Sequence, residues 1–187
     1  NVDSARIAAE LITDNDFKLK ATNTGAVAIN VGSYVSAAGT LTLSNATGVT
    51  VAVDTTGNFG NTIKADLAST ITVTGGADIG ATISGAAAST ISLNVGSGTV
   101  NVGSTALTTF ALTNSGSVEI SSASRMSGVQ TITVDTQKMA NLANLATTGL
   151  QTLQISGSGT LAAASFGVHS AGSTDLTISL TGLGGGF

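Results

Sequence analysis

The stretch Ala68-Ser69-Thr70-Ile71-Thr72-Val73 returns, with conservative changes, as Ala88-Ser89-Thr90-Ile91-Ser92-Leu93. Each stretch alternates apolar residues with Ser or Thr, which is the period of a strand with one buried face. In a second pair, Gly-Val-Gln-Thr-Ile-Thr-Val at Gly128–Val134 returns as Gly-Leu-Gln-Thr-Leu-Gln-Ile at Gly149–Ile155. The number of residues between the two copies is nearly the same in both repeats. This spacing predicts an all-β, β-helix-like solenoid of roughly 20-residue coils with two strands each.

Alternating stretches occur along most of the chain and are separated by Gly, Asn and Ser. Their centres recur about every nine to twelve residues, which also fits a β-sandwich or jelly roll as the alternative fold. Beyond the echoes, they lie at residues 17–20, 26–31, 40–43, 49–53, 90–95, 99–102, 117–120 and 176–180.

Four regions follow from the changes in pattern. In residues 1–16, Ile7 and Leu11 share one helical face, which predicts a short N-terminal helical cap. Residues 17–181 form the β-rich repeat domain. Within it, residues 137–148 place Met139, Leu142 and Leu145 three apart, which predicts a short helical insertion. Residues 182–187 are a Gly-rich tail.

The composition argues against several function classes. There is no Cys, so disulfides and thiolate metal sites are excluded. The six basic residues are scattered and the net charge is −4, which predicts no nucleic-acid partner. No apolar run approaches the roughly 20 residues of a membrane helix, so no membrane insertion is expected. Charged residues make up only 9%, so Ser, Thr and Asn must provide the polar surface.

Catalytic residues are not predicted. A hydrolytic triad requires a base, and the single His, His169, has no Gly-x-Ser-x-Gly nucleophile motif to serve. Aromatic residues are only 3%, which leaves no platform on which a polysaccharide-cleaving β-helix could stack sugars. We therefore expect a protein that is not an enzyme and has no organic cofactor.

The whole-chain composition resembles that of bacterial surface-layer (S-layer) proteins and related secreted β-solenoid surface proteins, which share low charge, an acidic pI and no Cys. The segments Ser127–Val134 and Gly149–Ile155 are similar to strand entries of that family. The resemblance implies a solenoid architecture and an extracellular, cell-surface location.

Calcium is the candidate cofactor. Asp14, Asn15 and Asp16 offer three oxygen-bearing side chains in succession, and Ca²⁺ takes six to eight oxygen ligands. A polar turn at the end of the helix is the alternative interpretation. S-layer proteins often carry a calcium nonapeptide, and Gly75-Gly76-Ala77-Asp78 is the nearest match to it here, although it lacks the third Gly. Asp78 is therefore the fourth candidate ligand, and an Asx-type turn is its alternative.

Pairs of hydroxyl residues flank an apolar residue in several strands: Thr70 and Thr72, Thr90 and Ser92, Thr131 and Thr133, Thr177 and Ser179. If the apolar residue points inward, the hydroxyls point outward. Thr is favoured in strands and is a natural exposed residue in a sheet of low charge. An ice-binding face is the other interpretation, and a regular Thr ladder on every coil would favour it.

Together these features predict a structural cell-surface protein that self-assembles into an S-layer lattice or an extracellular filament. Its main partner is itself, because unpaired strand edges are templates for another chain. Cell-surface polysaccharide is a further candidate partner. The alternative is an adhesin or autotransporter-type stalk that binds glycans or host proteins.

Overall fold

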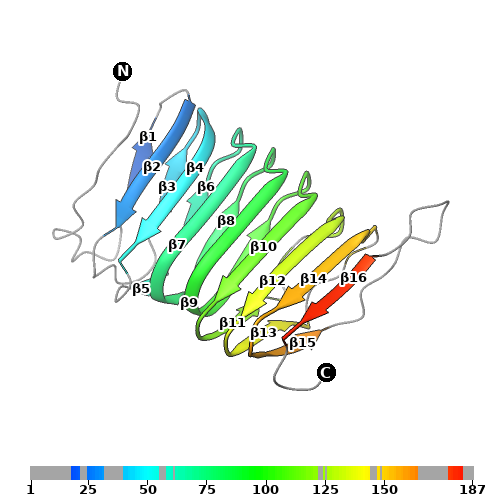
Figure 1. The fold of residues 1–187 in the computed structure, drawn as a ribbon. Coiled ribbons are helices and arrows are strands. Elements are labelled where there is room, and N and C mark those ends of the chain that lie inside the picture. The colour runs from blue at the N-terminus through cyan, green and yellow to red at the C-terminus, as the bar shows by residue number, and fades with distance from the viewer. Residues whose placement is uncertain are drawn as a thin grey trace.

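The computed structural model describes residues 18–21, 25–31, 40–54, 58–60, 62–121, 124, 126–143, 147, 149–163 and 177–182. This part of the chain forms sixteen strands and no helix. Every strand pair is parallel, and the strands stack coil upon coil along one axis (Figure 1). The predicted β-solenoid is confirmed. The expected N-terminal helix and residues 183–187 of the tail lie outside the described residues.

One long ladder of strands, here called the front ladder, covers a whole side of the solenoid (Figure 1). Its strands pair in chain order, each with the next coil. They are β2 (Gly25–Val31), β4 (Ala46–Val53), β7 (Thr70–Ile79), β9 (Thr90–Gly103), β10 (Thr109–Asn114), β12 (Thr131–Thr136), β14 (Thr152–Ser156) and β16 (Thr177–Thr181).

Two shorter ladders close the coils. The back ladder contains β1 (Lys18–Ala21), β3 (Thr40–Leu43), β6 (Thr62–Lys64), β8 (Thr82–Ser84) and the end of β9. The lower ladder contains β5 (Asn58–Phe59), the end of β7, the middle of β9, β11 (Ser117–Ile120), β13 (Met139–Leu142) and β15 (Thr160–Ala163).

The repeated sequence segments are aligned with one another by the register of the front ladder. Ile71 pairs with Ile91, and Val73 pairs with Leu93. In the second echo, Ile132 pairs with Leu153. Similar apolar side chains therefore stack on successive coils, so each coil packs against its neighbours with side chains of similar shape.

The core is a set of inward columns that run along the solenoid axis. One column of the front ladder contains Val27, Val49, Ile71, Ile91, Phe110, Ile132 and Leu153, all buried. It faces buried residues of the other ladders such as Ile63, Ile83 and Val102. Small and medium side chains suffice because the space inside a coil is narrow.

Glycines form the corner between the front and lower ladders. Gly75 has a φ of 82° and Gly76 a φ of 79°, in the left-handed region that L side chains rarely adopt. A Cβ on Gly75 would overlap the carbonyl oxygen of Val53 in the preceding coil. The segment from Gly75 to Asp78 is therefore an irregularity inside strand β7, and the Asx-type turn predicted for it is wrong.

The helical insertion predicted for residues 137–148 is wrong where the structure describes it. Met139–Leu142 is strand β13, paired with β11 and β15. Ala140 and Leu142 are buried while Met139 is exposed, so the period is two. The amide of Asn114 also donates to the carbonyl of Met139 at 2.9 Å. Pairing with two neighbouring coils outweighs a weak local preference for helix.

Candidate functional site

The four candidate calcium ligands are only partly described by the structure. Asp14, Asn15 and Asp16 lie outside the described residues. Asp78 lies on β7 in the lower ladder, where it is exposed and is paired in register with Asn58 and Ser97. Among the described residues, no group of three or more His, Cys, Asp or Glu could hold a metal ion. Calcium binding therefore stays a prediction. The part of the chain that the structure describes contains no membrane-spanning helix.

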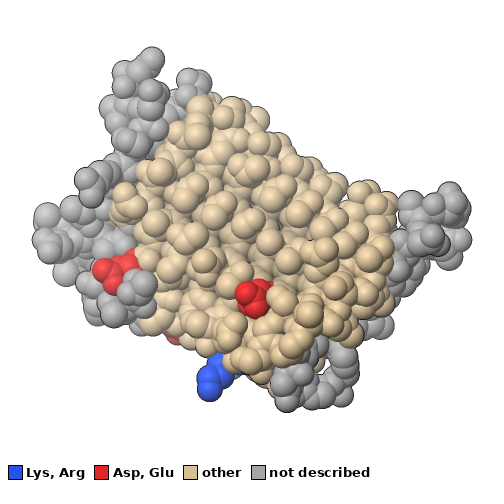
Figure 2. All heavy atoms as spheres, viewed as in Figure 1, with Lys and Arg blue, Asp and Glu red and all other residues tan. Residues whose placement is uncertain are grey.

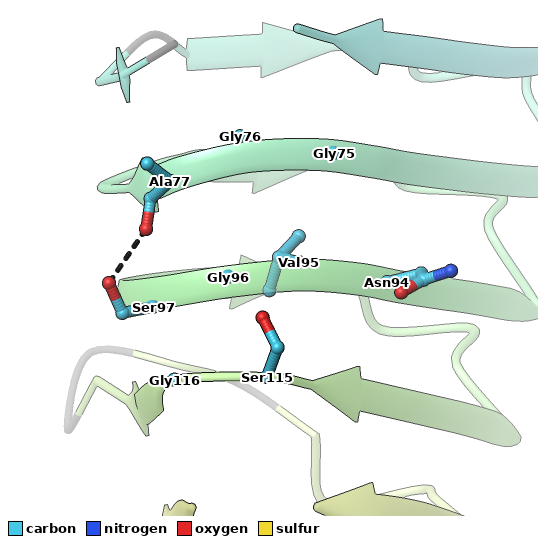
Figure 3. A pocket seen from close by; sticks show the side chains of 9 residues that line it. All are labelled: Gly75, Gly76, Ala77, Asn94, Val95, Gly96, Ser97, Ser115 and Gly116. Atoms are coloured by element: carbon cyan, nitrogen blue, oxygen red, sulfur yellow. Dashed lines mark hydrogen bonds between the residues drawn. The ribbon is translucent and has the colours of Figure 1, made fainter. Parts of the chain in front are cut away.

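A shallow groove follows the glycine corner (Figure 3). Its volume is about 560 Å³. Residues from three successive coils line it, and they are Gly75, Gly76, Ala77, Asn94, Val95, Gly96, Ser97, Ser115 and Gly116. The Ser97 hydroxyl donates to the carbonyl of Ala77 at 2.7 Å.

The groove exists because the corner backbones approach closely without side chains. A Cβ on Gly96 would lie 2.6 Å from the carbonyl oxygen of Gly76, and one on Gly116 would lie 2.9 Å from the Cβ of Ser97. Hydrogen bonds between coils use the same backbone, as in the Gly116 amide that donates to Gly96 at 2.7 Å. The groove is thus explained by coil packing alone.

The outer face of the front ladder carries a more specific pattern. Its first outward row contains threonine on six successive coils, in register: Thr70, Thr90, Thr109, Thr131, Thr152 and Thr177. The sequence pairs pointed to four of these residues but missed Thr109 and Thr152. These two were missed because the residue two positions on is Ala111 or Gln154, so neither threonine belongs to a hydroxyl pair.

The second outward row lies two positions further along each strand. It contains Thr50, Thr72, Ser92, Ala111, Thr133, Gln154 and Ser179. The third row contains Ala52, Thr74, Asn94, Thr113, Asp135, Ser156 and Thr181. Asp135 is the one charged residue in these three rows. Figure 2 shows a broad face of uncharged atoms with two separate acidic patches, one near its centre and one near its edge.

The last described strand of the front ladder, β16, has an unusual exposure. Ile178 and Leu180 occupy the inward columns, yet they are 54% and 44% exposed. All five residues of β16 are exposed, and among the described strands β16 pairs only with β14. The last strand of the described ladder therefore presents apolar side chains next to an edge that no other described strand pairs.

No protein-family model matches this chain, and no significant match is found among curated proteins or solved structures.

Proposed function

We propose that this chain is a structural protein of the bacterial cell surface that associates end to end, through the strand edges of its solenoid, into filaments or a lattice. The observation that carries the proposal is β16, whose apolar inward residues are exposed beside an edge that no described strand pairs.

An edge strand of this kind favours addition of another strand. Natural sheets blunt their edges with charged residues, Pro or bulges. The sequence of β16, Thr-Ile-Ser-Leu-Thr, contains no charged residue and no Pro. Its pairing with β14 is regular over five residues. Its backbone N–H and C=O groups can therefore accept a further strand in the same register.

The other end of the front ladder offers a matching strand. Among the described strands, β2 pairs only with β4, and its residues 25–31 carry no charge. Val27 and Ile29 lie in the same inward columns as Ile178 and Leu180. If β2 of a second copy pairs with β16, these columns continue from one molecule into the next.

Such a contact joins two different surfaces, so it does not close on itself. Repeated head-to-tail contacts generate an open filament unless a rotation closes them into a ring. Burial of Ile178 and Leu180 would contribute favourable free energy at each junction. The cell-surface location rests on the low charge, the absence of Cys and the resemblance to surface-layer proteins.

Sedimentation velocity over a range of protein concentrations tests the proposal, with Ca²⁺ and with a chelator. We expect the wild-type chain to form concentration-dependent assemblies. Ile178→Lys with Leu180→Lys should shift the population towards monomer, because two charges then lie at the junction. The matched control is Thr72→Lys with Thr133→Lys, which adds the same charge to the front face and should leave assembly unchanged.

Two results would overturn the proposal: a wild-type chain that stays monomeric in both buffers, or end variants that assemble like the wild type. The adhesin alternative predicts instead a monomer with a saturable ligand, which a glycan array would detect.

A further inference from the structure

We propose that the outer face of the front ladder binds ice. The inference is independent of end-to-end association, because it concerns the side of the solenoid and not its ends. It rests on the two hydroxyl-rich rows that begin at Thr50 and Thr70.

The rows form a two-dimensional array with fixed spacings. Neighbouring coils of a parallel ladder lie about 4.8 Å apart, and alternate residues on one strand lie about 6.6 Å apart. A face of crystalline ice likewise presents oxygen atoms at regular spacings in two directions. An array of hydroxyls on this grid can hold water molecules near ice positions over several coils at once.

The chemistry of threonine suits this role. Its hydroxyl both donates and accepts hydrogen bonds, as a water molecule in ice must. Its β-branched side chain has few allowed rotamers, so the hydroxyl positions are restricted before any ligand arrives. Partial burial supports this: Thr90, Thr109, Thr131 and Thr152 are half-buried within their row, although they face outward.

The low charge of the face favours ice over an ionic ligand. Charged side chains hold their own hydration water, and the first two rows contain none. The third row contains Asp135, so the proposed site is limited to the first and second rows. Crystalline polysaccharide is a regular surface too, but the exposed positions of these rows contain no aromatic residue on which a sugar could stack.

The hydroxyl array ends at β7 on its N-terminal side. In the first row, Thr70 is preceded by Gly48 and Ala26 on the earlier coils. A Cβ on Gly48 would lie 3.2 Å from the Thr70 hydroxyl oxygen, so the Thr70 side chain lies over the space that Gly48 leaves. The array of both rows therefore extends from β7 to β16.

The test uses the whole chain and ice itself. Thermal hysteresis and the fraction of protein incorporated into a growing ice hemisphere are measured for the wild type and for Thr131→Lys with Thr133→Lys, which disrupts both rows at the centre of the array. Ser117→Lys is the control for a Lys added outside the array, because Ser117 is exposed on β11 in the lower ladder. Circular dichroism confirms that each variant retains its strands.

We expect the wild type and Ser117→Lys to enter ice and to show thermal hysteresis, and the double Lys variant to lose both. If the double Lys variant does not fold, Thr131→Ser is measured instead. It retains the hydroxyl and should keep most of the activity. Exclusion of the wild type from ice would overturn the proposal, as would equal activity in the double Lys variant. Retention of the wild type on crystalline cellulose or chitin, without entry into ice, would assign the face to a polysaccharide and overturn it as well.

Discussion

Asn114 and Thr136 are paired in register on neighbouring coils, and both polar side chains are buried in an otherwise apolar column, at 1% and 0% exposed. The column passes through Val53, Gly75 and Val95 before it reaches them. The amide of Asn114 donates to the carbonyls of Gly116 and Met139, but its own Oδ1 and the Oγ1 of Thr136 have no hydrogen-bond partner. Asn114 therefore stabilises the fold by hydrogen bonds, whereas the Thr136 hydroxyl is buried without one.

Thr136→Val should stabilise the solenoid. The substitution keeps the shape of the side chain and removes a buried hydroxyl that makes no hydrogen bond, so the gain in the free energy of unfolding should be about 1 kcal/mol. Asn114→Leu should have the opposite effect. It leaves two partly buried carbonyls without their donor and should cost about 1–3 kcal/mol. Urea denaturation followed by circular dichroism measures both, and a destabilised Thr136→Val would show that the hydroxyl has a partner.

Gly75→Ala should destabilise the chain by about 3 kcal/mol or more, because the added Cβ meets the Val53 carbonyl and the backbone is in the left-handed region. Gly149→Ala is the control. Nothing lies within 4 Å of the Cβ that it would add, so its effect should stay within about 0.5 kcal/mol. Equal denaturation midpoints for the two variants would contradict the corner geometry.

Phe110→Ala should cost about 3–5 kcal/mol, since Phe110 is fully buried in the narrow core and the neighbouring coils cannot close the space that it leaves. Leu67→Ala should change the free energy of unfolding by less than about 0.5 kcal/mol, because Leu67 is 58% exposed in a turn. Urea titrations of both variants separate buried from exposed apolar residues. A small effect of Phe110→Ala would mean that the column is loosely packed.

The register of the front ladder can be tested by cross-linking, because the chain has no Cys of its own. Thr131 pairs directly with Thr152, so Thr131→Cys with Thr152→Cys should form an intramolecular disulfide on oxidation. In Thr131→Cys with Gln154→Cys the two residues are diagonal neighbours. Their Cα atoms are about 8 Å apart, beyond the reach of an unstrained disulfide. Mass spectrometry after mild oxidation compares the two. Faster closure of the diagonal pair would indicate a shifted register.

The sequence was most informative where neighbouring coils have nearly equal lengths. Strands β7 and β9 start at Thr70 and Thr90, and β12 and β14 start at Thr131 and Thr152. The two steps are almost equal, so both echoes are visible in the one-dimensional chain. The period-two alternation also predicted correctly which of these residues are buried, because one face of each strand lies against the core.

The threonine row was harder to predict because the coils differ in length. The step from Thr90 to Thr109 is the shortest in the row, and the step from Thr152 to Thr177 is the longest. Register is set by hydrogen bonds in the ladder, while the extra residues are accommodated between the front strands. No fixed period therefore aligns the six threonines, and Ala111 and Gln154 interrupt the second row.

The strand at Met139–Leu142 was missed for a related reason. Its pairing partners, β11 and β15, lie on the neighbouring coils and are distant in sequence. The local spacing of apolar residues resembles one helical turn, and only the hydrogen bonds to both neighbours make the segment extended. A single sequence gives no sign of those bonds.

The central claim, a solenoid that grows head to tail, is tested most directly by fibre diffraction from aligned assemblies of the purified chain, with electron microscopy of the same sample. We predict filaments of single-solenoid width with a reflection at about 4.8 Å along the filament axis, because the strands lie across that axis and the coils stack along it. Isolated rods at high protein concentration, both with Ca²⁺ and with a chelator, would contradict the claim. So would assemblies in which this coil spacing runs across the fibre.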